Sequence, residues 1–376
     1  MDLKKAVGQL LMVGFKGTSL QKSQLDHLAK IGVGGVVLFK QNYESLSQLV
    51  DLCNSIQHAL IPTAPDGLPA WISVDHEGGR VQRFGAPFTS FPPAAVWGKL
   101  NSPKTSFEAG YVMASELKAA GVNVNFCPVV DVPPSMEAPG LGDRVYSTDP
   151  EVVANLGSAT IRGIQKAGVL GVAKHFPGHG SAMVDSHIDL PVCDKSVEDL
   201  EARDWIPFRR VIRARAEGVM TAHLLFPKID TERPATLSRR ILQDHLRKGL
   251  RHTKLIFSDD MDMGAIRNKH GLKDAAFLAV EAGCDEILIC HSWDELEEVW
   301  EYLYKAFESG ALPMKKLEES WARISDAKRR FLMPYSDRKI AEASAIVGCA
   351  EFTAVAEALR EGRAIEKGPS AATDEA

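Results

Sequence analysis

Short apolar runs that predict β-strands recur eight times along this chain of 376 residues, and helix-like stretches separate most of them. The runs cover residues 9–15, 34–39, 70–74, 122–130, 170–173, 218–222, 254–257 and 286–290. Apolar residues at three- and four-residue spacing predict amphipathic helices at 45–60, 105–120, 150–167, 197–216, 238–250 and 274–282. Such alternation is typical of a parallel sheet with crossover helices. Eight units favour an α/β fold closed into a (β/α)8 TIM barrel over an open doubly wound sheet.

The pattern predicts a single domain followed by a short helical extension. Helices expected at 293–309 and 313–331 complete the barrel wall, so the barrel domain is expected to span residues 1–335. Residues 336–376 are expected to form a C-terminal helical extension, with one helix at 341–360 and a disordered tail from Gly368 onward, where residues are small and polar.

Ionisable side chains follow four of the predicted strands. They are Asp75, Lys174 with His175, His223, and Asp259. In a (β/α)8 barrel the residues at the carboxyl ends of the strands meet on one rim, which is where active sites form. We therefore expect these side chains to surround a common site.

Asp259 is followed directly by Asp260, and we expect only one of the two to point into the barrel mouth. Such a pair can be a helix N-cap with an acidic residue in the first turn. The strand-end position makes a catalytic role for Asp259 an equal alternative, with Asp260 orienting or structural.

The segment 178–187 resembles a loop over a site, and it carries Asp185 and His187 two residues apart. A carboxylate facing an imidazole fixes its tautomer and leaves the other ring nitrogen for proton transfer near neutral pH. A metal site is the alternative, since His175, His179, Asp185 and His187 are all possible ligands. Pro177-Gly178 excludes a helical His-x-x-x-His face, so no metal is expected.

Charged residues also gather in the glycine-containing segment 75–84, directly after a predicted strand. The segment has neither GxGxxG nor P-loop spacing, which argues against a phosphate site. Carboxylates and guanidinium groups facing one pocket suit a polyhydroxylated ligand, which needs acceptors and donors. A solvated surface loop with internal ion pairs is the alternative.

Composition narrows the possible partners and location. The net charge is −5 with no basic stripe, so nucleic acid is not expected as a partner. Neither a signal peptide nor eighteen consecutive apolar residues are found, so no membrane association is expected. The six cysteines are scattered without a CxxC pair, which fits a reducing cytoplasm and no disulfide framework.

Several motifs together resemble those of the glycoside hydrolase family 3 β-N-acetylglucosaminidases of bacterial cell-wall recycling. They include Lys-His-Phe-Pro-Gly-His-Gly at 174–180, Asp-Ser-His at 185–187 and Ser-Asp-Asp at 258–260. Further matches lie at 74–84, 89–92, 125–132 and 142–144, in the same order along residues 5–335. The Asp-Ser-His loop distinguishes this branch from the family-3 β-glucosidases.

The resemblance implies a retaining exo-β-N-acetylglucosaminidase acting on peptidoglycan-derived muropeptides. It implies Asp259 as nucleophile and His187 as general acid/base, with Asp185 as the partner of His187. It also implies sugar-binding roles, which fall on Asp75, Arg83, Arg144, Lys174 and His175. A saccharide is the expected partner, no cofactor is expected, and the protein is expected to be a monomer.

Two alternatives remain open at this level. A β-N-acetylglucosaminide phosphorylase or a β-glucosidase could use the same scaffold. A non-catalytic sugar-binding or metal-binding barrel is the alternative of another class, and the complete Asp259, Asp185 and His187 set argues against it.

Overall fold

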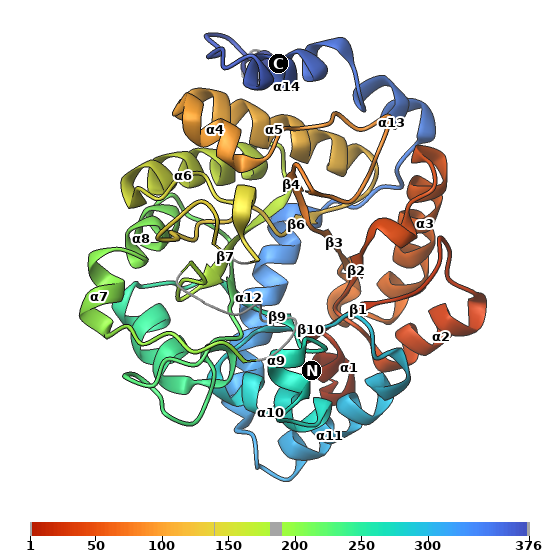
Figure 1. The fold of residues 1–376 in the computed structure, drawn as a ribbon. Coiled ribbons are helices and arrows are strands. Elements are labelled where there is room, and N and C mark those ends of the chain that lie inside the picture. Colours follow the sequence, from red (N-terminus) through yellow and green to blue (C-terminus); the bar gives the residue numbers. More distant parts are fainter. Residues whose placement is uncertain (1, 139, 181–189, 374–376) are drawn as a thin grey trace.

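The computed structural model describes residues 2–138, 140–180 and 190–373, and its centre is a closed barrel of parallel strands (Figure 1). Around the barrel the order is β1, β2, β3, β6, β7, β8, β9 and β10, and β10 pairs again with β1. Their bounds are β1 Leu11–Gly14, β2 Gly35–Leu38, β3 Trp71–Val74, β6 Val124–Asn125, β7 Leu170–Phe176, β8 Gly218–Thr221, β9 Leu255–Asp260 and β10 Glu286–Ile289. Each predicted run supplies one barrel strand, so the predicted (β/α)8 TIM barrel is confirmed.

Close packing between neighbouring strands depends on Gly35 of β2. The parallel register places Gly35 beside Met12 of β1 on one side and beside Trp71 of β3 on the other. A Cβ atom at residue 35 would lie 2.5 Å from the Trp71 Cβ, so a larger residue would displace the Trp71 side chain. Every residue of β1, β2 and β3 is buried, as expected for a parallel sheet covered by helices.

Helices surround the barrel and follow the order of the chain. Their bounds are α1 Leu3–Gly8, α2 Lys22–Ile31, α3 Leu46–Leu60, α4 Ala94–Leu100, α5 Pro103–Ala119, α6 Pro150–Lys166, α7 Val197–Ala202, α8 Trp205–Arg213, α9 Gly264–Arg267, α10 Leu272–Ala282, α11 Leu296–Glu308 and α12 Met314–Leu332. A π-helix, Arg240–Gly249, occupies the stretch predicted at 238–250. Within the described ranges, no helix has both the length and the apolar character needed to cross a membrane.

Two of the predicted helices are each divided in two. The stretch 197–216 forms α7 and α8, because Arg203 leaves the helical conformation (φ −140, ψ −72). Next to it, the buried Asp204 accepts a hydrogen bond of 2.6 Å from Lys195 Nζ. The stretch 341–360 forms α13 (Ile340–Ile346) and α14 (Ala350–Arg360), which are divided at Gly348 with φ +71, a left-handed conformation that favours glycine.

Other local elements also differ from the prediction. The sequence did not predict α2, α4 or the antiparallel hairpin of β4 (His76–Gly78) and β5 (Val81–Gln82) that follows β3. Strand β7 continues to Phe176, so Lys174 and His175 lie within the strand rather than after it. The register between β7 and β8 shifts between Ala173 and Phe176, at the level of these two residues.

The C-terminal segment packs on the outside of the barrel, where Figure 1 shows it in blue beside α4 and α5. Helices α13 and α14 contact α5, and the tail contributes a 3₁₀ turn, η8 (Pro369–Thr373), which also contacts α5. Part of the stretch expected to form the tail lies in this turn, and the structure describes the chain as far as Thr373. Buried Ser370 attaches it by donating two hydrogen bonds to Glu108, from N at 3.0 Å and from Oγ at 2.6 Å.

Candidate active site

The carboxyl ends of the barrel strands surround a cavity of about 370 Å³. Its apolar floor includes Val37 of β2, Phe126, Met220 of β8 and Leu288 of β10. Six of the eight residues implied by the sequence line this cavity: Asp75, Arg83, Arg144, Lys174, His175 and Asp259. The other two, Asp185 and His187, lie outside the described residues.

His223 was expected on the same rim, but the structure gives it a different place. Its side chain is fully buried, with Nδ1 2.8 Å from Thr236 Oγ1 and Nε2 2.9 Å from the carbonyl oxygen of Asp260. These contacts hold the end of β9 in position. His223 is absent from the residues that line the cavity.

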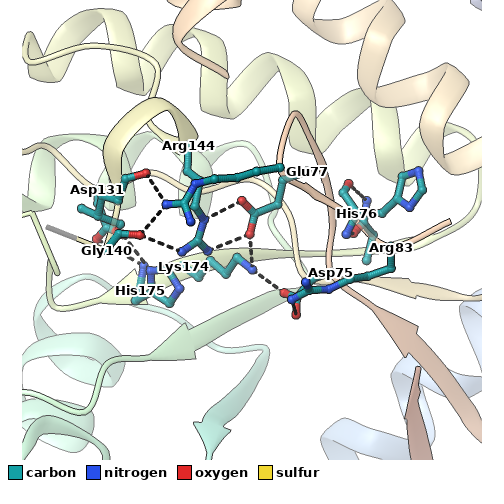
Figure 2. A network of polar contacts seen from close by, with 12 residues as sticks. Asp75, His76, Glu77, Arg83, Asp131, Gly140, Arg144, Lys174 and His175 are labelled. Atoms are coloured by element: carbon teal, nitrogen blue, oxygen red, sulfur yellow. Dashed lines mark hydrogen bonds and ion pairs between the residues drawn. The ribbon is translucent and has the colours of Figure 1, made fainter. Parts of the chain in front are cut away.

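Lys174 is the centre of a buried charge network, shown in Figure 2. Its ammonium lies 2.5 Å from Asp75 Oδ1 and 2.6 Å from Glu77 Oε1, and its side chain is 2% exposed. Arg144 donates to both oxygens of Glu77, from Nε at 2.9 Å and from Nη2 at 2.8 Å. Arg83 approaches Asp75 more loosely, with Nη2 3.4 Å from Oδ2.

The network keeps its members ionised. Burial opposes ionisation of Asp75, but Lys174 and Arg83 outweigh it and hold the pKa of this carboxyl well below its usual value. Burial also opposes ionisation of Glu77, yet Arg144 and Lys174 lower its pKa to about 2. Lys174 has a raised pKa, because its two carboxylates outweigh its burial. The cavity therefore presents charged acceptors and donors side by side, which can bind the hydroxyl groups of a sugar.

His175 is oriented by Asp131, which is fully buried directly after the run that contains β6. Asp131 Oδ2 lies 2.7 Å from His175 Nδ1, and its Oδ1 accepts a hydrogen bond of 2.7 Å from the backbone N of His179. Burial opposes ionisation of Asp131, but the His175 ring outweighs it and the pKa is lowered. A carboxylate at Nδ1 fixes the imidazole tautomer and leaves Nε2 available to a ligand.

The sequence interpretation did not select Glu77 and Asp131 as site residues. Both were visible in the motifs, Glu77 two residues after Asp75 and Asp131 at the end of a predicted strand run. They act by orienting Arg144, Lys174 and His175, and a role of that kind depends on contacts between distant parts of the chain.

Asp259 and Asp260 both reach the cavity wall at the end of β9, although only one was expected to do so. Asp260 is the more strongly held, since its Oδ1 accepts hydrogen bonds of 3.1 Å from the backbone N of both Asp262 and Cys290. Its Oδ2 lies 3.5 Å from His291 Nε2. Burial raises the pKa of Asp260 to about 6. Asp259 accepts a hydrogen bond of 2.8 Å from the backbone N of Asp260.

The metal alternative receives no support from the part of the chain that is described. Within it, no group of three or more His, Cys, Asp or Glu side chains is arranged to hold a metal ion. Of the four ligands considered from the sequence, His175 and His179 lie in this part, and Asp185 and His187 do not.

Comparisons with known proteins agree with this architecture. The glycosyl hydrolase family 3 N terminal domain matches residues 2–327. A β-hexosaminidase of Nitrosomonas eutropha is 42% identical over 303 residues, which is 78% of this chain and 85% of that protein. A β-hexosaminidase of Xylella fastidiosa is 40% identical over 288 residues, which is 75% of this chain and 83% of that protein.

Solved structures show the same relationship. A glycoside hydrolase family 3 β-N-acetylglucosaminidase from Paenibacillus sp. superposes with a TM-score of 0.87 at 32% identity, covering 96% of this chain and 69% of that one. NagZ from Neisseria gonorrhoeae, in complex with N-trifluoroacetyl-D-glucosamine, gives a TM-score of 0.77 at 30% identity, covering 94% and 98%. The protein is thus an enzyme of the glycoside hydrolase class. Within that class it belongs to glycoside hydrolase family 3, which confirms the resemblance found in its motifs.

Proposed function

We propose that this protein is a retaining exo-β-N-acetylglucosaminidase, which removes terminal N-acetylglucosamine from peptidoglycan-derived muropeptides. The observation that carries the proposal is the position of Asp259. Its carboxylate and the network of Asp75, Lys174 and Arg144 line the same cavity. A nucleophile and a set of sugar-binding groups around one small cavity are the parts that an exo-acting glycosidase needs.

The reaction has two steps. Asp259 attacks the anomeric carbon while His187 donates a proton to the departing glycosidic oxygen, and the glycosyl group becomes an ester of Asp259. Water, deprotonated by His187, then cleaves that ester and restores the β-configuration. An imidazole titrates near neutral pH, so His187 can give and take this proton without the raised pKa that a carboxyl would need.

Asp185 and His187 enter the mechanism from the sequence motif, and the neighbouring residues support this assignment. His179 lines the cavity, and its backbone N is bonded to Asp131. At Gly180 a Cβ atom would lie 2.5 Å from the Val132 carbonyl carbon, so the chain passes close to the segment after β6. The described part of the chain thus reaches the cavity at His179, six residues before Asp185 in the sequence.

The sugar would be held by Asp75, Arg83, Arg144, Lys174 and His175. The two carboxylates of the network orient Lys174 and Arg144 before a ligand arrives, which reduces the entropy lost on binding. The relatives support N-acetylglucosamine as the sugar, since they are β-hexosaminidases and a β-N-acetylglucosaminidase by name.

The proposal also covers the location and the oligomeric state: we propose a cytoplasmic monomer. All six cysteines lie in the described part of the chain and are free thiols, which supports a reducing compartment.

Labelling of the nucleophile tests the proposal. A fluoro-sugar substrate that forms the glycosyl-enzyme quickly and hydrolyses slowly should modify Asp259 in the peptide containing Ser258-Asp259-Asp260. Asp259→Ala should abolish turnover of nitrophenyl N-acetylglucosaminide while the protein stays folded. Nitrophenyl glucoside should be a much poorer substrate for the unmodified enzyme. Labelling of Asp260, or an active Asp259→Ala variant, would refute the assignment.

A further inference from the structure

We propose that the C-terminal segment, residues 336–373, is a brace that positions the β4–β5 hairpin and with it the sugar-binding residue Arg83. The inference rests on the proposed function, because it takes Arg83 as a sugar-binding group. It gives the segment a role in substrate affinity in addition to the burial of apolar surface. Glu116 on α5 is the residue through which the brace acts.

Glu116 connects three parts of the chain. Its side chain lies between α5 and the C-terminal segment and is almost fully buried. Glu116 Oε1 accepts hydrogen bonds from Gly348 N at 2.8 Å and from Thr89 Oγ1 at 2.7 Å. Its Oε2 accepts a hydrogen bond from Thr89 N at 2.9 Å. One carboxylate thus ties the junction of α13 and α14 to the loop that follows β5.

The C-terminal segment also contacts this loop directly on either side of Thr89. A Cβ atom at Gly348 would lie 2.2 Å from the carbonyl oxygen of Pro87, so the two backbones are in close contact. Arg360 at the end of α14 donates a hydrogen bond to the carbonyl oxygen of Ser90. Three neighbouring positions of the loop are therefore held from outside the barrel.

The same loop positions the hairpin. Gln82 of β5 donates a hydrogen bond of 3.1 Å to the Thr89 carbonyl and accepts one of 2.9 Å from the Phe91 backbone N. The Phe91 carbonyl in turn accepts a hydrogen bond of 2.9 Å from Gly79 N at the turn between β4 and β5. A shift of the loop would therefore move both strands of the hairpin.

Arg83 directly follows β5, and its own side-chain contacts are weak. Its Nη2 lies 3.4 Å from Asp75 Oδ2, and its guanidinium carbon lies 5.9 Å from the centre of the Phe39 ring. Its Nε is buried, and no group in the described ranges accepts a hydrogen bond from it. Because few side-chain contacts fix Arg83, its position depends on the backbone that the loop holds.

Glu108, nearer the start of α5, provides a matched control. It too is buried and accepts a backbone and a hydroxyl hydrogen bond, but both come from Ser370 in the C-terminal segment. The two glutamates therefore fasten the same segment to the same helix. Among the described residues, Glu116 accepts hydrogen bonds from the loop after β5, whereas Glu108 accepts them from Ser370.

The experiment compares Glu116→Gln with Glu108→Gln. Glutamine keeps the size of the side chain, but its amide nitrogen cannot accept a hydrogen bond, so each variant loses one acceptor. We expect both variants to lower the Tm by similar amounts, whereas only Glu116→Gln raises KM for nitrophenyl N-acetylglucosaminide, about five-fold at similar kcat. A KM unchanged in Glu116→Gln, or raised equally in both, would overturn the brace. Should Glu116→Gln fold poorly, Thr89→Val replaces the hydroxyl that donates to Glu116 with a methyl group. An unchanged KM in that variant would also overturn the brace.

A double-mutant cycle with Arg83→Ala identifies the route. If the brace acts through Arg83, adding Glu116→Gln to Arg83→Ala should raise KM little further. Fully additive effects would overturn this route. An unchanged KM in Arg83→Ala alone would refute the sugar-binding role of Arg83 and the brace together. If Arg83→Ala raises KM and Glu116→Gln leaves KM unchanged, the brace is overturned and the proposed function remains intact.

Discussion

Glu77 accepts two roughly parallel hydrogen bonds from the Arg144 guanidinium, at 2.9 Å from Nε and 2.8 Å from Nη2. Lys174 Nζ lies 2.6 Å from the same carboxylate, so one buried anion compensates two cations of the cavity. Removing one partner of a buried ion pair lowers the free energy of unfolding by more than the intact pair contributes to it, because the remaining charges are left buried and uncompensated.

Glu77→Gln should therefore lower the free energy of unfolding by about 3 kcal/mol at pH 7. It should also raise KM, because Arg144 and Lys174 lose the group that orients them. Urea unfolding and steady-state kinetics with nitrophenyl N-acetylglucosaminide measure the two effects. Asp143→Asn is the control: its ion pair with Arg80 is roughly half exposed, and we expect a loss below about 1 kcal/mol. If both variants lost the same free energy of unfolding, burial would not explain why the Glu77 network is sensitive to substitution.

The role of His187 can be separated from binding by changing the leaving group. A nitrophenolate departs with little protonation, whereas a sugar alcohol needs a proton from the enzyme. His187→Ala should thus slow hydrolysis of a natural disaccharide by about 10²–10⁴-fold and formation of the glycosyl-enzyme from a nitrophenyl sugar far less. Asp185→Ala should show the same trend more weakly. Equal losses on both substrates would indicate a binding or structural role instead.

Phosphate distinguishes a hydrolase from a phosphorylase. Lys174 and Arg144 are already compensated by Asp75 and Glu77, so neither cation is free to attract a phosphate ion into the cavity. We expect turnover to release free N-acetylglucosamine at a rate nearly independent of millimolar phosphate. Product analysis by mass spectrometry checks this. Sugar 1-phosphate as the main product would replace the hydrolase assignment with a phosphorylase.

A second buried ionisable group lies at the opposite end of the strands, at the start of β10. Glu286 is fully buried and accepts a hydrogen bond of 2.8 Å from Trp71 Nε1, while the buried Lys328 donates to Gln9 and Gly34. Burial raises the pKa of Glu286 to about 8, although Lys328 opposes the rise. Burial lowers the pKa of Lys328 to about 8.

Glu286→Gln should change how stability depends on pH. Below pH 4.5, the ordinary value for glutamic acid, the carboxyl is neutral in both folded and unfolded states. As the pH rises toward 8, the unfolded chain releases this proton and the folded chain retains it, so the wild type loses stability relative to the variant. We expect a relative loss of about 3 kcal/mol between pH 5 and pH 7.5, measured by urea unfolding. The exposed Glu342→Gln should show no such trend. A difference in stability between wild type and Glu286→Gln that stays constant with pH would contradict the buried, protonated state.

The sequence predicted the barrel well because the barrel strands are buried over nearly all of their length and each contributes a short apolar run. It also identified the motifs that carry Asp75, Lys174 and Asp259, since strand ends of a barrel share one rim. It missed the orienting carboxylates, because Glu77 and Arg144 are 67 residues apart and Asp131 and His175 are 44 apart. The division of the last helix at Gly348 likewise depends on the loop at Pro87, a contact that no local pattern contains.

Closure of the barrel has a consequence for the synthesis of the chain. Leu11 of β1 pairs with Ile287 of β10, so the first strand to leave the ribosome acquires one of its two neighbours only when the last strand has been made. Until then, the nascent sheet presents two open edges to the surrounding solution, and unpaired edges promote association between chains. Pairing of β1 with β10 closes the sheet, so neither of these strands keeps an open edge in the folded barrel.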